Sequence, residues 1–211
     1  MEIKRERIQK AIEEVLKEKG KRKFSQSVDV AINFQDVDFK KPENRVNSDI
    51  VLPFAAKREK VAVFADGQLA TDAKKTADLV LSSSDIPIYA ADKKKQGELL
   101  QYSLLSAPQL MAQIGKALGQ FLGSKGKLPK PIMPNANITE LIERTRKTVT
   151  VRTKGKYLPT VHCIIGKEEM TSEQITENVL AVLEVLRKSI TEQQIANMYV
   201  KLTMGKPVKI T

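Results

Sequence analysis

The sequence of 211 residues contains one cysteine, one histidine and no tryptophan. A single cysteine excludes an internal disulfide framework and a zinc site built on several thiolates. A single histidine leaves no second imidazole for a His-based metal site. No apolar run approaches the roughly 18–20 residues that a membrane span needs, and residues 1–20 lack the apolar block of a secretory signal. We therefore expect a cytoplasmic protein that has no membrane partner and no metal.

Common enzyme motifs are also missing. Neither Gly-x-Gly-x-x-Gly nor Gly-x-x-x-x-Gly-Lys-Ser/Thr occurs. His162 and Cys163 are adjacent on an expected strand, where neighbouring side chains point to opposite faces, so a thiol–imidazole pair is not favoured and Cys163 is expected in the core. Asp66-Gly67 follows an apolar strand, and there we favour a plain turn over a ligand site. The sequence thus predicts no catalytic residue and no cofactor.

The charge is strongly basic and unevenly distributed. The chain has 36 Lys and Arg against 25 Asp and Glu, a formal net charge of +11. No acidic residue occurs in 99–139, in 144–156 or after Glu192, while lysines and arginines occur in all three stretches. A hydrophobic content of 41% still fits a folded protein, with few aromatics and hence an aliphatic core. Three separated acid-free stretches favour a polyanion as partner, with nucleic acid first.

The two ends of the chain show the same pattern, a helix combined with strands of alternating apolar residues. Near the N-terminus, helical spacing of apolar residues predicts a helix that stops at Gly20, and alternation predicts strands at 28–34 and 48–52. Beyond residue 148 we expect strands at 149–153, 157–165 and 198–204, with a helix that opens on a Thr171–Gln174 capping box. Neither end offers enough elements for a core, so we predict that both form one α+β domain.

The middle of the chain reads differently. Short apolar runs at 61–65, 77–81 and 102–105 alternate with helix-like stretches at 69–76, 93–100 and 108–122. Continuous apolar strands that alternate with helices are typical of a parallel sheet covered on both faces. We therefore predict an α+β domain of residues 1–55 and 154–211, interrupted by an inserted α/β domain of residues 56–153 with a parallel, Rossmann-like sheet.

Three segments are candidates for binding. Residues 118–131 are rich in glycine, proline and lysine and are expected to form a loop. On these residues alone, a solvated connection and a phosphate-contacting loop are equally favoured. In 23–29, strand parity turns Ser25, Ser27 and Asp29 away from the core, where hydroxyls and a carboxylate can read ribose 2′-OH groups. In 202–207, Gly205 permits close approach of a partner to the backbone. Taken singly, the last two are more typical of ordinary strand ends.

Together the motifs carry a resemblance. They are Lys-Phe-x-x-Ser-Val-Asp-Val at 23–30, Leu-Gly-x-Lys-Gly-x-x-Pro-x-Pro at 122–131, Val-His-x-x-x-Gly-Lys at 161–167 and Thr-Met-Gly at 203–205. In this order, over essentially the whole chain, they resemble the universal ribosomal protein L-one family, and Gly126-Lys127 with Pro129-Lys130-Pro131 resembles its archaeal form. That family forms the mobile lateral stalk of the large ribosomal subunit.

The resemblance implies a two-domain ribosomal protein whose partners are large-subunit rRNA, exit-site tRNA and its own mRNA, and which is a monomer when free. It implies binding of 23S-type rRNA, help in releasing deacylated tRNA from the exit site, and repression of its own messenger. Secondary RNA contacts are expected from Lys125, Lys127, Lys154 and Lys156. The primary RNA-binding positions implied are Lys23, Phe24, Ser25, Ser27, His162, Gly166, Lys167, Thr203, Met204 and Gly205.

Two other functions stay open on the residues. One is an RNA-binding repressor or assembly factor that acts outside the ribosome. The other is a nucleotide-using enzyme built on the central α/β unit, which the missing phosphate loop disfavours.

Overall fold

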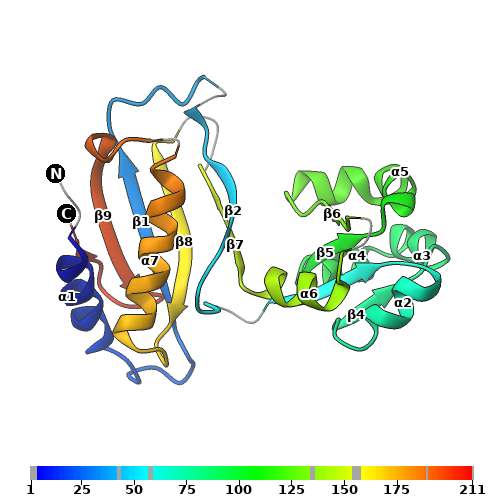
Figure 1. Cartoon of the computed structure of the whole chain (residues 1–211), viewed down its shortest axis with the longest axis horizontal. Coiled ribbons are helices and arrows are strands. Elements are labelled where there is room, and N and C mark those ends of the chain that lie inside the picture. The colour runs from blue at the N-terminus through cyan, green and yellow to red at the C-terminus, as the bar shows by residue number, and fades with distance from the viewer. Residues whose placement is uncertain are drawn as a thin grey trace. The chain divides into compact units, whose positions relative to one another are not determined.

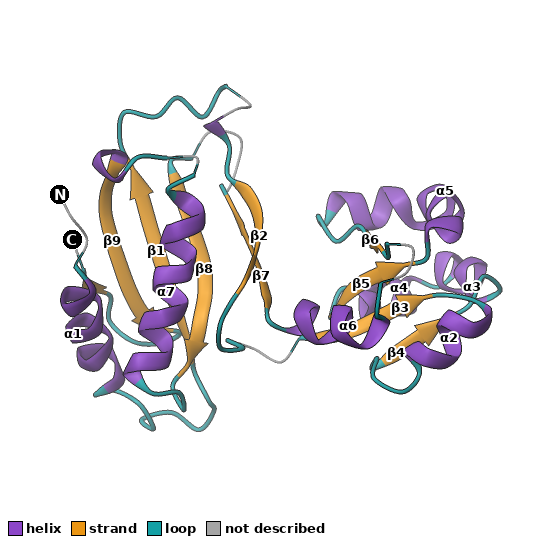
Figure 2. Cartoon of the chain, viewed as in Figure 1, coloured by secondary structure: helices purple, strands orange, loops and turns teal. Residues whose placement is uncertain are grey.

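The computed structural model describes residues 4–41, 44–56, 59–133, 136–153, 158–188 and 190–210. The chain divides into two compact units, which Figures 1 and 2 show. The discontinuous unit comprises residues 1–57 and 147–211, and the inserted unit comprises residues 58–146. The N- and C-terminal parts of the chain therefore build one unit together.

The discontinuous unit is built on a four-stranded sheet of order β10-β9-β1-β8, antiparallel throughout. Along β1 every second residue is buried, from Val28 to Phe34, as the alternation predicted. The strands are β1 (Ser27–Phe34), β8 (Thr160–Lys167), β9 (Ile195–Leu202) and β10 (Val208–Lys209).

Two helices cover the buried face of this sheet (Figure 1). They are α1 (Arg5–Leu16) and α7 (Ser172–Leu186), and a short 3-10 turn, η2 (Glu192–Gln194), leads into β9. The predicted capping box is present: the Thr171 hydroxyl accepts from the Gln174 N–H, and the Thr171 N–H donates to the Gln174 side chain. This box satisfies amides that the first turn of α7 leaves without helical partners.

A two-stranded ladder of β2 (Asn47–Val51) and β7 (Thr148–Arg152) belongs to the same unit. The sequence pattern predicted a strand at 149–153 that resembles the end elements, but the predicted domain boundary at 153 grouped this strand with the inserted segment. The structure instead pairs Val51 with Thr148 and buries Val151 completely in the core of the discontinuous unit. The difference arises because β7 makes its pairing with a strand about a hundred residues earlier, which local sequence pattern does not reveal.

The inserted unit contains a parallel sheet of order β4-β3-β5-β6. Val61 and Val63 of β3 enter one apolar cluster with residues of α2 and α6, while Ala62 and Phe64 enter another with residues of α3, α4 and α5. Both faces are thus covered, which confirms the predicted parallel-sheet architecture beside the α+β unit. The strands are β3 (Lys60–Phe64), β4 (Leu79–Leu81), β5 (Tyr102–Ser106) and β6 (Lys130–Pro131). The helices are α2 (Gly67–Ala73), α3 (Asp85–Ala91), α4 (Lys93–Leu99), α5 (Pro108–Ser124) and α6 (Ile138–Arg146).

Several elements of the inserted unit differ from expectation. Helix α5 runs on to Ser124, so residues 118–124 of the predicted loop are helical, with Leu118 and Leu122 buried one turn apart. Burial of these two leucines outweighs the cost of Gly119 and Gly123 in this stretch of the helix, which is about 1 kcal/mol for each glycine. Helices α3 and α6 were not predicted. Asp66-Gly67, expected as a plain turn, opens α2.

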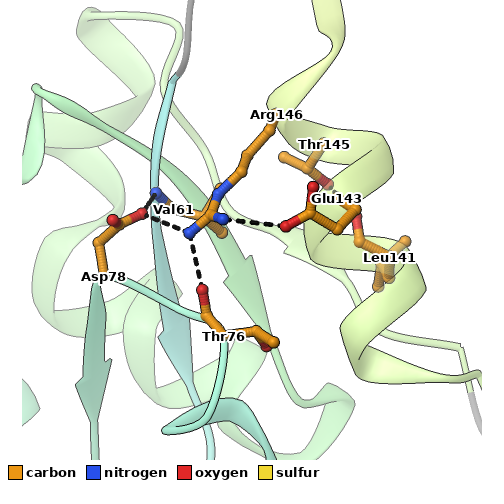
Figure 3. Close-up of polar contacts among 7 residues, drawn as sticks. All are labelled: Val61, Thr76, Asp78, Leu141, Glu143, Thr145 and Arg146. Carbon is orange, nitrogen blue, oxygen red and sulfur yellow. Dashed lines mark hydrogen bonds and ion pairs between the residues drawn. The ribbon is translucent and has the colours of Figure 1, made fainter.

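A cluster of polar contacts closes the inserted unit (Figure 3). Arg146, at the end of α6, donates to the Thr76 carbonyl at 2.7 Å, to Asp78 Oδ2 at 3.1 Å and to Glu143 Oε1 at 2.9 Å. The same Asp78 oxygen accepts the Val61 N–H at 2.8 Å. One carboxylate therefore joins the first strand of the unit to its last helix.

Candidate RNA-binding surface

Most of the predicted RNA-binding residues gather at one end of the antiparallel sheet. The register pairs Ser27, the first residue of β1, with Lys167, the last residue of β8. It also pairs Val28 with Leu202, the last residue of β9. We call this end the strand-end surface, formed by Lys23, Phe24, Ser25, Ser27, Gly166, Lys167, Thr203, Met204 and Gly205.

Thr203 is bonded directly to the start of β1. Its hydroxyl accepts the Ser27 N–H at 3.1 Å and lies 3.3 Å from the Ser27 carbonyl oxygen, to which it can donate. The Thr203 N–H donates to that same carbonyl at 3.0 Å. The hydroxyl therefore holds two distant segments together and keeps one lone pair for an outside donor.

Exposed apolar side chains accompany the polar groups of this surface. Phe24 is 51% exposed and Met204 is 59% exposed. Phe24 precedes β1 and Met204 follows β9, so both exposed side chains are accessible to a partner at this end of the sheet. A ring and a thioether beside lysines and hydroxyls suit the mixed polar and apolar surface of a folded RNA.

The two glycines serve close packing. A Cβ on Gly166 would lie 2.9 Å from Ile175 Cγ1 and 3.3 Å from Met170 Sδ. A Cβ on Gly205 would lie 3.0 Å from the Cβ of Leu202. Gly166 is buried, and its lack of a side chain lets α7 approach β8 beneath the surface. The RNA contact that the resemblance implies for Gly166 stays a prediction.

His162 is the exception among the predicted residues. It lies on β8 opposite Ala31, five positions before Lys167 and thus about 17 Å along the strand from it. Its side chain is exposed, whereas Cys163 is buried in the core as predicted. Burial raises the pKa of the Cys163 thiol to about 12, with a smaller effect from Asp29, so this thiol stays protonated near neutral pH.

Gln26 and Glu168 were missed by the sequence analysis. Gln26 is 2% exposed and Glu168 is 8% exposed, although both are polar. Gln26 Nε2 donates to Glu168 Oε2 at 3.2 Å, and Gln26 Oε1 accepts the Met204 N–H at 3.1 Å. A signal was available, because Gln26 has the same strand parity as Val28 and Val30, and parity turns it inward.

The predicted secondary contacts belong to two places. Lys125 and Lys127 lie in the inserted unit, just after α5, where the Lys127 N–H donates to the Leu122 carbonyl. Lys154 and Lys156 fall outside the described residues. Within the described ranges, no group of three or more His, Cys, Asp or Glu side chains could hold a metal ion. In that same part of the chain, no helix is long and apolar enough to cross a membrane.

Comparisons of the sequence with known proteins identify the family. The model of the ribosomal protein L1p/L10e family matches residues 15–206. The chain is 41% identical to "Large ribosomal subunit protein uL1" of Thermofilum pendens over 95% of this chain and 93% of that protein. It is 38% identical to the protein of the same name from Archaeoglobus fulgidus over the full length of both. The resemblance of the motifs is thereby confirmed, and the chain belongs to the ribosomal protein L1p/L10e family, whose members are ribosomal proteins and not enzymes.

Proposed function

We propose that this chain is a protein of the large ribosomal subunit that binds large-subunit rRNA through the strand-end surface. The observation that carries the proposal is the convergence of three segments, around residues 27, 167 and 203, at one end of one sheet. Segments so far apart in the sequence supply lysines, hydroxyls and exposed apolar groups to one place.

The chemistry of the surface suits folded RNA. Lys23 and Lys167 can neutralise phosphates, which releases condensed counterions and makes binding depend on salt. The hydroxyls of Ser25 and Ser27 can bond 2′-OH groups, which DNA lacks. Phe24 and Met204 can pack against sugars or bases. The surface is held by bonds of the protein's own backbone, so little order has to be gained on binding.

Family membership also supports a proposal of finer roles. We propose that the protein is part of the lateral stalk of the cytoplasmic ribosome, that it aids release of deacylated tRNA from the exit site, and that it represses its own mRNA. A messenger that mimics the ribosomal site would use the same strand-end surface, so one set of residues serves both RNAs. The basic segment after α5 is then free to make secondary RNA contacts from the inserted unit.

Titration of the full chain with a large-subunit rRNA fragment across a salt series tests the proposal. Lys167→Ala should weaken binding and lower the slope of log affinity against log salt by about one, because one phosphate contact is lost. Lys188→Ala is the matched control. That lysine is equally part of the discontinuous unit, but it follows the last turn of α7, roughly 20 Å of helix away from Thr171. It should leave both quantities unchanged.

Lys125→Ala and Lys127→Ala separate the two units. Each should change the affinity for the rRNA fragment by well under tenfold, since these lysines make only secondary contacts. A hundredfold loss with either variant, together with unaltered binding by Lys167→Ala, would place the primary site in the inserted unit and contradict the proposal.

A further inference from the structure

The side-chain amide of Gln26 connects all three segments of the strand-end surface. It belongs to the first segment, between Ser25 and Ser27. Its Nε2 reaches Glu168, which follows β8, and its Oε1 reaches the backbone of Met204, which follows β9. The Gln26 carbonyl also accepts the Glu168 N–H at 3.0 Å. No other side chain in the described hydrogen bonds of this surface touches both of the other segments.

Burial excludes a direct contact between Gln26 and a large partner. The residue is 2% exposed, whereas Phe24, Ser25, Thr203 and Met204 around it are exposed. Gln26 thus lies beneath the groups that would meet RNA, and its influence on a partner must pass through them.

We propose that Gln26 is the positioning residue of the strand-end surface and that Glu168 is its buried partner. The proposal rests on the proposed RNA-binding function. Gln26 fixes where the Met204 backbone lies relative to the segments around Ser27 and Lys167, so that an RNA meets a preformed surface.

The chemistry of the site requires a side chain with both a donor and an acceptor. A carboxamide donates to the Glu168 carboxylate and accepts from the Met204 N–H at once. A glutamate at position 26 would still accept from Met204 but would set two carboxylates against each other. A methionine would fill the volume and leave both the amide and the carboxylate unpaired, which is costly for buried groups.

Three variants of the full chain test the positioning role. Gln26→Met and Gln26→Glu should each weaken binding of the rRNA fragment by about tenfold or more, because the released segment must be ordered on binding. The double variant Gln26→Glu with Glu168→Gln reverses the donor and the acceptor and keeps the net charge. It should bind within about threefold of the parent chain.

A matched control separates positioning from loss of stability. Asn178 is another fully buried amide of the discontinuous unit, and it bonds Phe54 and Ile165 at 2.8–3.0 Å. Asn178→Ala should lower the unfolding temperature yet leave RNA affinity unchanged at temperatures where the protein is folded. Gln26→Met should lower affinity there with an unchanged salt slope, since no charge is lost, and hydrogen exchange at the Met204 amide should accelerate.

The outcomes distinguish the two proposals. Weakened binding by Lys167→Ala with full affinity of Gln26→Met and of Gln26→Glu would overturn the positioning role and leave the RNA-binding function intact. Unaltered binding by Lys167→Ala and by the Gln26 variants would overturn both. If Gln26→Glu fails to fold, the double variant still decides, because a folded double variant that binds tenfold more weakly than the parent contradicts a role for this hydrogen-bond pair.

Discussion

At the scale of single residues, the Thr203 hydroxyl shows how structure changes the interpretation of a motif. The sequence presents Thr203 as a small polar group on an exposed strand end, ready to meet a 2′-OH. The structure bonds its oxygen to the backbone of Ser27, 176 positions earlier. Any RNA contact is therefore shared with a structural bond, and both disappear when the hydroxyl is removed.

Thr203→Val tests this double duty, because it keeps the shape of the side chain and deletes the hydroxyl. We expect the free energy of unfolding to fall by about 1 kcal/mol, the usual net value of one hydrogen bond. RNA affinity should fall by about tenfold, with the salt slope nearly fixed since no charge is lost. Thr203→Ser should retain both. Chemical denaturation and equilibrium RNA titration measure the two effects, and unchanged affinity in a folded Thr203→Val protein would contradict the assignment.

The burial of a side chain could be predicted where it depends only on the alternation within one strand. Alternation placed Val28 and Val30 inward and Ser27 outward, and it placed Cys163 in the core. The same rule, applied to Gln26, would have turned it inward as well. It could not have supplied the partners, because Glu168 and Met204 are brought near only by the packing of strands from opposite ends of the chain.

At the scale of elements, identical glycine substitutions should have opposite effects. A Cβ on Gly166 would come within 2.9 Å of the buried Ile175, so Gly166→Ala should destabilise the protein by about 1–3 kcal/mol. Gly115 lies on an exposed turn of α5, where a Cβ has nothing within 4 Å. Gly115→Ala should therefore stabilise by up to about 1 kcal/mol. Urea unfolding of both variants checks the signs.

A double variant identifies the cause of the Gly166 effect. Ile175→Ala removes the atoms that a new Cβ would strike. If steric overlap is responsible, Gly166→Ala and Ile175→Ala together should destabilise by less than the sum of the two single effects. Strict additivity would mean that the cost at Gly166 comes from somewhere other than the approach of α7.

Local patterns also explain which elements were predicted and which were not. Helix α7 has a capping box and an apolar face, and both are visible in the sequence. Helix α3 has a proline at its third position, which a first turn tolerates although the residue usually signals a break. Helix α5 was predicted at 108–122, while the glycines of 118–131 suggested a loop that overlaps its end; burial of Leu118 and Leu122 continues the helix to Ser124.

At the scale of the whole molecule, the discontinuous unit has its own core. Its apolar cluster draws on both ends of the chain, from Ile8 to Ile210, and includes none of the described residues between 57 and 146. Near Pro53 the alternating strands give way to short continuous apolar runs, and this change allowed the insertion to be predicted from sequence. The second domain boundary was predicted at residue 153, several residues after the division at residue 147, because β7 pairs with β2 and not with a strand nearby in sequence.

Deletion of residues 58–146, with the ends joined by a short Gly-Ser linker, should leave a folded, RNA-binding protein. The Leu52 N–H donates to the Lys147 carbonyl at 3.0 Å, so a residue five positions before the first cut is bonded to the first residue after the second cut. We expect cooperative unfolding by circular dichroism and rRNA affinity within about tenfold of the full chain. A longer deletion, 56–153, removes β7 and with it the buried Val151, and should be measurably less stable. An unfolded 58–146 deletion would contradict independent folding of the discontinuous unit.

The Asp78 carboxylate has a consequence for how such a chain can arise. Because it accepts from Val61 near the start of the inserted unit and from Arg146 at its end, the unit begins and finishes at one point. For the β2–β7 ladder, an inserted unit whose two ends meet is equivalent to a hairpin turn. Such a unit avoids the closure entropy that grows with the length of a flexible loop. A gene fragment that encodes such a unit can therefore be inserted at a surface turn of an existing protein, or be exchanged for another, without further changes to the sequence of the recipient domain.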